Sequence, residues 1–284
     1  MWLIKIVAIL CGVYVLVVAA MFFAQTWLIF PSFMISDGRP HLPDSGQRLE
    51  IETPDGEHLH GVHLPPLRAG GGEKTVVLGF AGNGWHAEGM VLDLRRHFPE
   101  CDVVAFNYRG YRPSSGRPSA AGMLADSLLI HDHIQATIGP MRTITAGYSL
   151  GTGVAAYVAR QRPVAGIILV TPFDSLEAVA QERYPWVPVR WLIRHRMSTV
   201  DFLRGLPIPT AMIAAERDVV VPPSRTAALR KAIGNLVLDR TIAGTQHNTI
   251  FRYPEFAQAM RDAMAAIDAN PASRASGDPH SSAR

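Results

Sequence analysis

One serine lies between two glycines, at the point where strand-forming residues give way to a helical pattern. In "TITAGYSLGTGVAAYVARQRP", residues 143–163, Gly147 and Gly151 stand two residues before and two after Ser149. This Gly-x-Ser-x-Gly spacing is typical of a sharp strand-to-helix turn that exposes a nucleophilic hydroxyl. Larger side chains at the two glycines would collide with neighbouring strands. We therefore predict that Ser149 is a nucleophile and not merely a small turn residue.

A serine hydroxyl needs a general base, and that base needs an orienting acid. Asp218 follows the strand-like run "TAMIAA", and His247 follows the next such run, "LVLDRTI". Both positions fall on loops at the carboxyl ends of strands, where parallel sheets collect functional groups. The chain order serine, acid, histidine fits a triad of Ser149, Asp218 and His247. Glu216 and Asp174 remain alternative acids.

A tetrahedral intermediate also needs donors for its oxyanion, each contributing about 3 to 4 kcal/mol when well placed. The backbone N–H of Leu150, directly after the nucleophile at the start of a helix, is the first candidate. The second is the backbone N–H of Asn83 in the loop "FAGNG", where glycines on both sides permit a close approach to substrate.

Short apolar runs alternate with helical patterns over most of the chain, which indicates a mostly parallel sheet with helices on both faces. An antiparallel hairpin around Asp55-Gly56 precedes this part. We predict strands at 75–80, 102–108, 143–148, 166–170, 210–215 and 236–242, and helices at 87–97, 119–138, 150–161, 224–233 and 254–268. Such an arrangement places the carboxyl ends of the strands, and with them the candidate triad, at one edge.

Composition excludes several classes of protein. With 284 residues and 48% hydrophobic content, the chain has the size of one α/β domain plus an appendage. The net charge of +3 is small and the basic residues are scattered, so nucleic-acid binding is not expected. Cys11 lies in an apolar run and leaves Cys101 without a partner, so no disulfide framework is predicted. His131 and His133 point apart on a helix, and we expect neither a metal nor a cofactor.

The appendage is an apolar segment at the start of the chain. Residues 6–24 are 19 consecutive apolar or small residues, close to the ~20 that cross a bilayer as a helix. We predict a single-pass membrane anchor in residues 1–28. The alternative is a cleaved signal peptide with a site near "VVAA". The basic Lys5 and the α-amino group favour a hydrolytic domain outside the cytoplasm.

Two glycine-rich stretches resemble phosphate-binding motifs and are an alternative to the triad. "GNGWHA", residues 82–87, matches the Gly-x-Gly-x-x-Ala dinucleotide fingerprint. Dinucleotide binding requires an acidic residue at the end of the second strand, whereas Asp102 is the first residue of that strand. In "GGGEKT", Glu73 breaks the Gly-Lys pair of a Walker motif. Neither motif accounts for Ser149, Asp218 and His247.

Several motifs together resemble one known family. "GFAGNGWHAEG", "VVAFNYRGYRPSSGRPSAAGMLAD", "GYSLGTGVA", "TPFDSL", "YPWVPVRWLIRHR", "ERDVVVP" and "HN" occur in the order found in membrane-anchored α/β-hydrolase-domain serine hydrolases, whose eukaryotic relatives include protein depalmitoylases. The resemblance covers residues 47–266. It implies an N-terminal anchor, the α/β-hydrolase fold and a triad of Ser149, Asp218 and His247. Ala81 and Arg112 depart from the family's usual histidine and glycine.

We accordingly expect a connector at 29–46, a hydrolase domain at 47–269 with a lid-like insert at about 173–207, and a disordered tail at 270–284. Trp186 and Trp191 in "YPWVPVRWLI" are candidate substrate or lid residues. They would line an acyl pocket, face the membrane, or form the inner face of an ordinary helix. The first of these possibilities predicts that Trp191→Ala weakens the preference for longer acyl chains.

The leading functional hypothesis is a serine hydrolase that cleaves esters or thioesters of lipophilic acyl groups through an acyl-enzyme. An amidase or peptidase would use the same triad, so that alternative stays open. A catalytically inactive, membrane-anchored binding module is a third hypothesis, motivated by Ala81 and Arg112.

Overall fold

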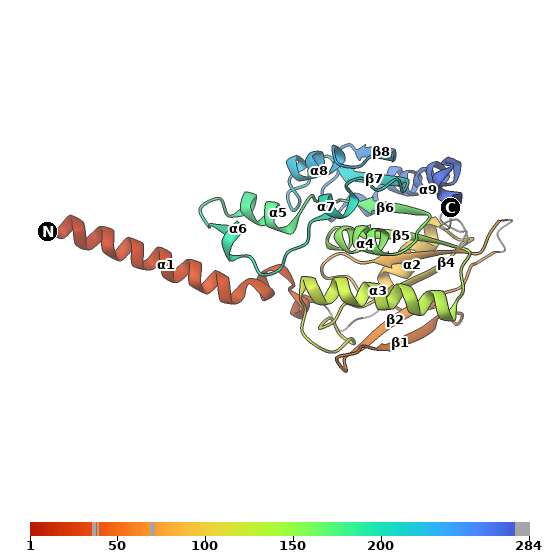
Figure 1. The fold of residues 1–284 in the computed structure, drawn as a ribbon, viewed down its shortest axis with the longest axis horizontal. Helices are drawn as coiled ribbons and strands as arrows, with labels where there is room; N and C mark the ends of the chain where they lie inside the picture. Colours follow the sequence, from red (N-terminus) through yellow and green to blue (C-terminus); the bar gives the residue numbers. More distant parts are fainter. Residues whose placement is uncertain (36–37, 39, 69–71, 276–284) are drawn as a thin grey trace, which may run out of the picture.

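The protein is built around a single eight-stranded sheet (Figure 1). The computed structural model describes residues 1–35, 38, 40–68 and 72–275. The strand order is β1-β2-β4-β3-β5-β6-β7-β8; β1 and β2 are antiparallel to their neighbours, and all other pairs are parallel. The strands are β1 Gln47–Glu52, β2 His58–Leu64, β3 Thr75–Phe80, β4 Asp102–Phe106, β5 Arg142–Tyr148, β6 Gly166–Val170, β7 Thr210–Ala215 and β8 Leu236–Ile242.

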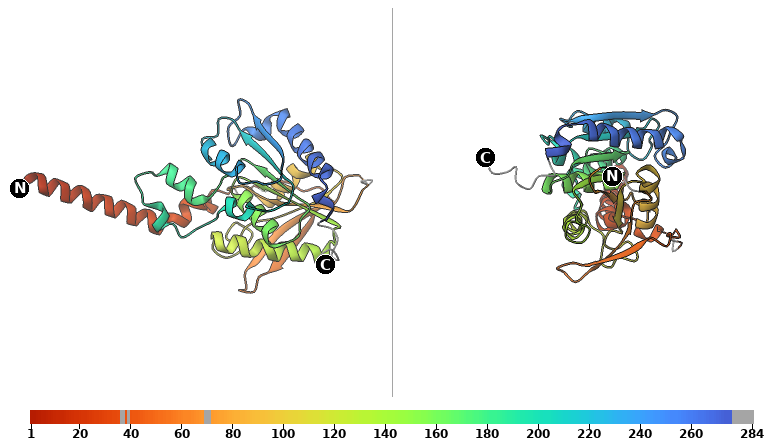
Figure 2. Two further views of the ribbon diagram at one scale, coloured as in Figure 1. Left: turned by 45° about the horizontal axis from the view of Figure 1, so that its top comes forward. Right: turned by 90° about the vertical axis from the view of Figure 1, so that its right-hand side faces the viewer.

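Helices cover both faces of the sheet (Figure 2), and the sheet separates the core into two apolar layers. On one face α2 (Ala87–His97) and α9 (Pro254–Ala269) contribute buried side chains such as Met90 and Phe256. The other face is covered by α3 (Ala120–Thr137), α4 (Leu150–Gln161), α7 (Thr199–Leu203) and α8 (Pro223–Arg230). β3 to β7 are therefore buried on both sides, which explains why their sequences are continuous apolar runs. The remaining helical elements are α5 Leu176–Arg183, α6 Val189–Leu192, α10 Ala272–Ala275 and the 3-10 turns Ser32–Met34 and Ile250–Arg252.

The expected fold class is confirmed, and so is the position of every predicted strand. The observed elements differ from the expected ones mainly in where they end. The strand expected at 102–108 ends at Phe106, and one further bond of the β2–β4 pairing follows it, from the Asn107 N–H to the His60 carbonyl. The helix expected at 224–233 ends at Arg230, since Ile233 pairs with Arg204 in an isolated β-bridge. Within the tail expected to be disordered, residues 272–275 instead form α10 and Ser273 is buried; residues 276–284 lie outside the described part of the chain.

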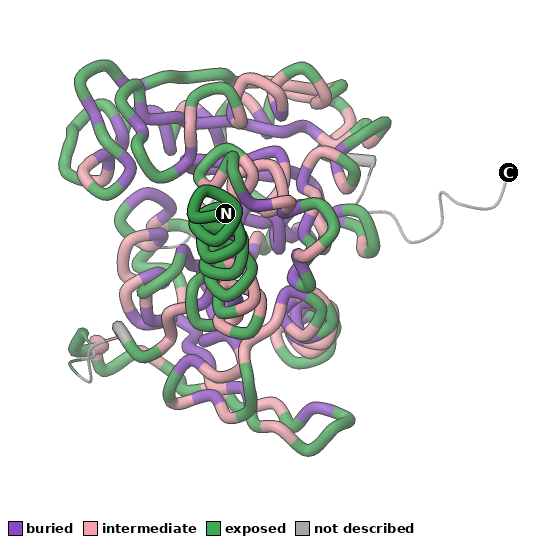
Figure 3. Tube along the Cα trace, turned by 90° about the vertical axis from the view of Figure 1, so that its left-hand side faces the viewer, coloured by how far each residue is buried: buried purple, intermediate pink, exposed green. Residues whose placement is uncertain are grey.

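The N-terminal helix α1 (Trp2–Ile29) projects from the domain and is exposed over most of its length (Figure 3). It has 28 residues, a mean hydropathy of 2.8 over its most apolar window, and is the one described helix long and apolar enough to span a bilayer. At 1.5 Å per residue it is about 42 Å long. Its contacts with the rest of the protein begin at Tyr14, whose ring packs against Trp186.

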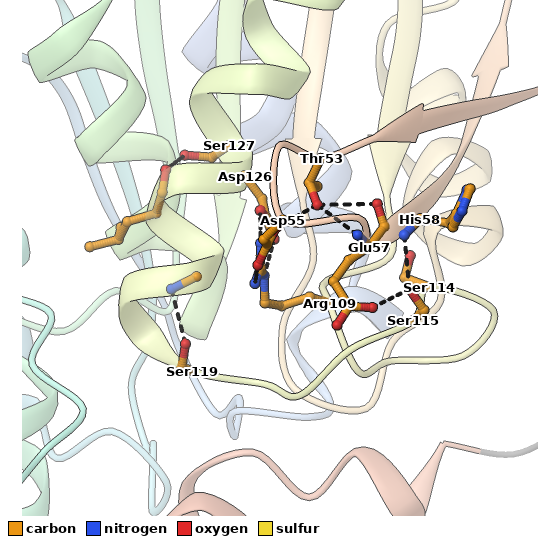
Figure 4. Close-up of polar contacts among 12 residues, drawn as sticks. Thr53, Asp55, Glu57, His58, Arg109, Ser114, Ser115, Ser119, Asp126 and Ser127 are labelled. Carbon is orange, nitrogen blue, oxygen red and sulfur yellow. Dashed lines mark hydrogen bonds and ion pairs between the residues drawn. The ribbon is translucent and has the colours of Figure 1, made fainter.

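A charged cluster holds the hairpin turn against the sheet's outer helix (Figure 4). Arg109, in the loop after β4, donates to Asp126 of α3 at 2.7 Å and to Asp55 of the β1–β2 turn at 2.9 Å. Hydrogen bonds from Arg109 and Thr53 lower the pKa of Asp55 to about 2. This loop also carries Tyr111, which contacts the candidate site.

Candidate active site

The turn at Ser149 has the backbone strain expected of an exposed nucleophile. Ser149 adopts φ 49° and ψ −114°, a backbone conformation with positive φ that residues other than glycine rarely adopt. Its backbone N–H donates to the carbonyl of Val170 at 2.9 Å, which fixes the turn to β6. A Cβ atom on Gly151 would overlap the carbonyl oxygen of Phe80, and one on Gly147 would overlap that of Gly151. Glycine is therefore required at both flanking positions.

The structure brings Ser149, His247 and Asp218 into one chain of hydrogen bonds. His247 Nε2 lies 2.9 Å from Ser149 Oγ, and His247 Nδ1 lies 2.7 Å from Asp218 Oδ2. Asp218 and His247 are buried, so water does not compete for these bonds. A carboxylate accepts a hydrogen bond from the Nδ1–H group of the imidazole. This leaves Nε2 free to accept a hydrogen bond from the serine hydroxyl.

Asp218 is itself held by the backbone. Its Oδ1 accepts from the N–H groups of Val220 and Val221 at 2.9 and 2.8 Å. The loop after β7 therefore presents the second oxygen, Oδ2, to His247 in a fixed direction. Such an orienting acid is what a histidine base requires.

The two alternative acids lie in other interactions. Asp174 accepts from the backbone N–H of Ser175 at 2.7 Å and pairs with Arg225 at 3.2 Å; burial raises its pKa. Glu216 accepts from the backbone N–H of Gly244 at 2.8 Å. Neither contacts His247. Asp102, which the dinucleotide reading would use, contacts His63 at the start of β4, away from the edge that holds Ser149.

The two expected oxyanion donors lie beside the serine. Leu150 is the first residue of α4, and Asn83 lies in the loop after β3; both line the same cavity as Ser149. The Asn83 side chain fixes that loop, because its Oδ1 accepts from the Tyr111 hydroxyl at 2.6 Å and its Nδ2 donates to the Ile29 carbonyl at 2.7 Å. Burial raises the pKa of Tyr111, which keeps the phenol protonated as a donor.

The two departures from the family pattern lie outside the cavity. Ala81 is buried, and its carbonyl accepts from the Tyr108 hydroxyl at 2.8 Å. Arg112 is exposed and does not line the cavity around Ser149. Neither residue disturbs the hydrogen bonds of Ser149, His247 and Asp218.

The cavity at Ser149 has a volume of about 480 Å³, within the usual range for small-molecule sites. Its walls are mainly apolar and come from the ends of α1, α4 and β3, from α5 and from the loop after Asp218. The lining residues are Leu28, Ile29, Asn83, Ser149, Leu150, Phe173, Leu176, Val179, Ala180, Arg183, Tyr184, Val219, Val220 and Val221.

The tryptophans expected to line an acyl pocket do not reach this cavity. Trp186 is 49% exposed and packs edge-on against Tyr14 and Tyr184, whereas Trp191 is 75% exposed beneath the Arg190 guanidinium. The inward positions of the same segment are Val187, Val189 and Ile193, all buried. The expectation that Trp191 contacts the acyl chain is therefore wrong for this cavity, and its side chain faces outward.

No residue pattern indicated that α1 contributes to the site. Leu28 and Ile29 were assigned to an anchor and a connector, yet both line the Ser149 cavity. Val219, Val220 and Val221 were also missed, although an apolar run directly after the candidate acid is a visible signal. The contribution of α1 depends on its packing against α5 and α6, which residue patterns do not encode.

Comparisons with known proteins agree with this fold. A family model described as alpha/beta hydrolase fold matches residues 76–193. An uncharacterized protein of Mycobacterium tuberculosis is 32% identical over 225 residues, covering 78% of this chain and 79% of that protein. Lysophosphatidylserine lipase ABHD12 of Xenopus tropicalis is 30% identical over 190 residues, covering 56% of this chain and 49% of the lipase.

Solved structures show the same fold at low sequence identity. The esterase Pf2001 of Pyrococcus furiosus superposes with a TM-score of 0.63 at 18% identity, covering 81% of this chain and 98% of that one. An alpha-beta hydrolase from Vibrio vulnificus superposes with a TM-score of 0.63 at 22% identity, covering 78% and 81%. At these identities the likeness concerns the fold alone.

Proposed function

This chain belongs to the α/β-hydrolase fold family, and we propose that it is a serine hydrolase that cleaves carboxylic ester or thioester bonds through an acyl-enzyme. The observation that carries the proposal is the unbroken hydrogen-bond chain from Asp218 through His247 to Ser149. It ends at a cavity large enough for a ligand. An inactive binding module would have no need for a strained serine held in this arrangement.

The proposed reaction follows from the positions of the polar atoms. His247 Nε2 removes the proton of Ser149 Oγ as the oxygen attacks the carbonyl carbon of the substrate. The N–H groups of Leu150 and Asn83 stabilise the oxyanion, and Asp218 stabilises the imidazolium. His247 then protonates the leaving alcohol or thiol. Water, activated by the same histidine, hydrolyses the acyl-enzyme and frees Ser149.

The apolar cavity supports a lipophilic acyl substrate. Phe173, Leu176, Val179 and Val220 surround the space beside Ser149, and few polar groups compete for an ester's acyl chain. The similar protein of Xenopus tropicalis is named a lysophosphatidylserine lipase, which supports a lipid substrate. An amidase or peptidase would use the same triad, and turnover of acyl against peptidyl substrates separates the two possibilities.

We further propose that α1 is an uncleaved, single-pass anchor and that the domain lies outside the cytoplasm. The helix contacts the domain from its middle to its C-terminal end: the Tyr14 hydroxyl donates to the Trp186 carbonyl at 2.9 Å, and Thr26 Oγ1 lies 2.8 Å from His195 Nε2. Cleavage near "VVAA" would remove the first of these contacts. The orientation rests on Lys5 and the α-amino group at the N-terminal side.

The substrate class is tested with p-nitrophenyl esters from acetate to octanoate on the full-length protein in detergent. Each methylene that enters the cavity contributes up to ~0.8 kcal/mol, or about fourfold, to transition-state binding. We expect kcat/KM to rise over this series. Because Trp191 faces outward, Trp191→Ala should leave the slope unchanged. A preference for acetate would refute the lipophilic substrate while leaving the serine hydrolase intact.

A further inference from the structure

A second, narrow cavity lies between α1 and the segment that carries α5 and α6. Figure 1 shows this segment beside the C-terminal half of α1. The cavity, here called the α1 groove, has a volume of about 80 Å³. Val18, Met21 and Phe22 of α1 form one wall, and Val187, Val189 and Leu192 form the other.

The α1 groove adjoins the cavity at Ser149. Leu28, Ile29, Ala180 and Tyr184 line both. Two of them belong to α1 and two to the α5 region, so the same two walls continue from the serine into the groove. A chain attached to Ser149 therefore has an apolar route along α1.

The side-chain amide that lines the α1 groove is already paired. Gln25 is the one amide among the groove residues; its Nε2 donates to the carbonyls of Phe22 at 2.7 Å and Leu192 at 3.3 Å, and its Oε1 accepts from the N–H of Arg194 at 2.7 Å. These bonds tie α1 to the residues after α6. They also leave the groove with little to offer a polar ligand, whereas an alkyl chain needs no hydrogen bonds.

The groove also lies where a bilayer surface would meet the domain. α1 is about 42 Å long, some 12 Å more than the ~30 Å hydrocarbon core, so about eight residues extend beyond the core. The groove uses residues 18–29, the end of α1 nearest the domain. Trp27, Trp186 and Trp191 are exposed there, as is common at membrane interfaces.

We propose that α1 is one wall of the acyl-binding site, and that the acyl chain of a membrane-resident ester runs from Ser149 along the α1 groove and reaches the bilayer sideways. The inference rests on the proposed function, since it concerns the acyl group that Ser149 would accept. It makes the membrane helix part of the specificity site as well as a tether. The acyl chains of the surrounding membrane lipids are chemically similar to that of the substrate. Only the acyl chain of a substrate would be attached to Ser149, and this attachment distinguishes the two.

The direct test uses a long-chain alkyl fluorophosphonate with a diazirine in the middle of its chain, applied to the full-length protein in phosphatidylcholine vesicles. After labelling of Ser149 and irradiation, peptide mapping should place the cross-links at residues 18–29 and 187–193. An adduct on Ser149 with cross-links confined to 219–221 or to α8 would overturn the inference alone. Absence of the Ser149 adduct would overturn the proposed function and, with it, this inference.

A pair of tryptophan substitutions on α1 provides a second test. Met21→Trp fills the α1 groove, whereas Ala20→Trp adds the same side chain at an exposed position that lines neither cavity. The ratio of kcat/KM for palmitate to that for butyrate esters should fall about tenfold in Met21→Trp and stay unchanged in Ala20→Trp. Equal ratios in the two variants would contradict a chain that lies along α1.

Discussion

Replacing Ser149 by alanine is expected to lower kcat for p-nitrophenyl octanoate by a factor on the order of 10⁵ to 10⁶. The substitution removes the oxygen that would form the acyl-enzyme and leaves His247 with no hydroxyl to activate. The oxyanion donors and the cavity remain, so a small residual rate above that in water should persist. Single-turnover assays on full-length protein, purified separately from any wild-type enzyme, would measure the loss.

Ser224→Ala is the matched control for this loss. Ser224 is exposed in α8, where its hydroxyl donates to Glu182, and it does not line the Ser149 cavity. Its kcat should equal that of the wild type. Activity that survives Ser149→Ala at the level of this control would show that another residue performs the chemistry.

Asp218→Asn is expected to lower kcat by about 10⁴-fold while the protein stays folded. The asparagine Oδ1 can still accept from the N–H groups of Val220 and Val221. Its amide would donate to His247 Nδ1, however, and so favour the tautomer that carries a proton on Nε2. That tautomer cannot accept the proton of Ser149.

Asp174→Asn separates the orienting acid from a buried carboxylate of the same type. Asp174 forms an ion pair with Arg225 and accepts a hydrogen bond from the backbone N–H of Ser175, and it does not contact His247. We expect its kcat to stay within about threefold of the wild type, with the substitution acting on thermal stability instead. If Asp174→Asn lost activity and Asp218→Asn kept it, the assignment of the acid would be reversed.

Residue patterns predicted the sheet because strands buried on both faces are continuous apolar runs. "GIILV" and "TAMIAA" therefore coincide with β6 and β7. They also indicated Ser149, Asp218 and His247 as the candidate site, because each follows a strand at the sheet's carboxyl edge. The structure places His247 within hydrogen-bonding distance of both Ser149 and Asp218.

The walls of the site were not predictable in the same way. Trp191 was expected to contact an acyl chain because of its size and apolarity, but α6 is one short turn whose inward side is formed by Val189 and Ile193. Leu28 and Ile29 form a wall where α1 is bound to the domain by contacts such as those of Gln25 with Leu192 and Arg194, residues far away in sequence. Contacts of this kind depend on tertiary packing, and a single chain's local pattern does not report them.

Intact-mass and peptide analysis after reaction with a short alkyl fluorophosphonate tests the central claim, a nucleophilic Ser149, most directly. The account predicts one adduct per wild-type chain, located on the peptide that contains Ser149, and none on the Ser149→Ala protein. An adduct that persists in Ser149→Ala, or a folded wild-type protein that remains unlabelled, would contradict it.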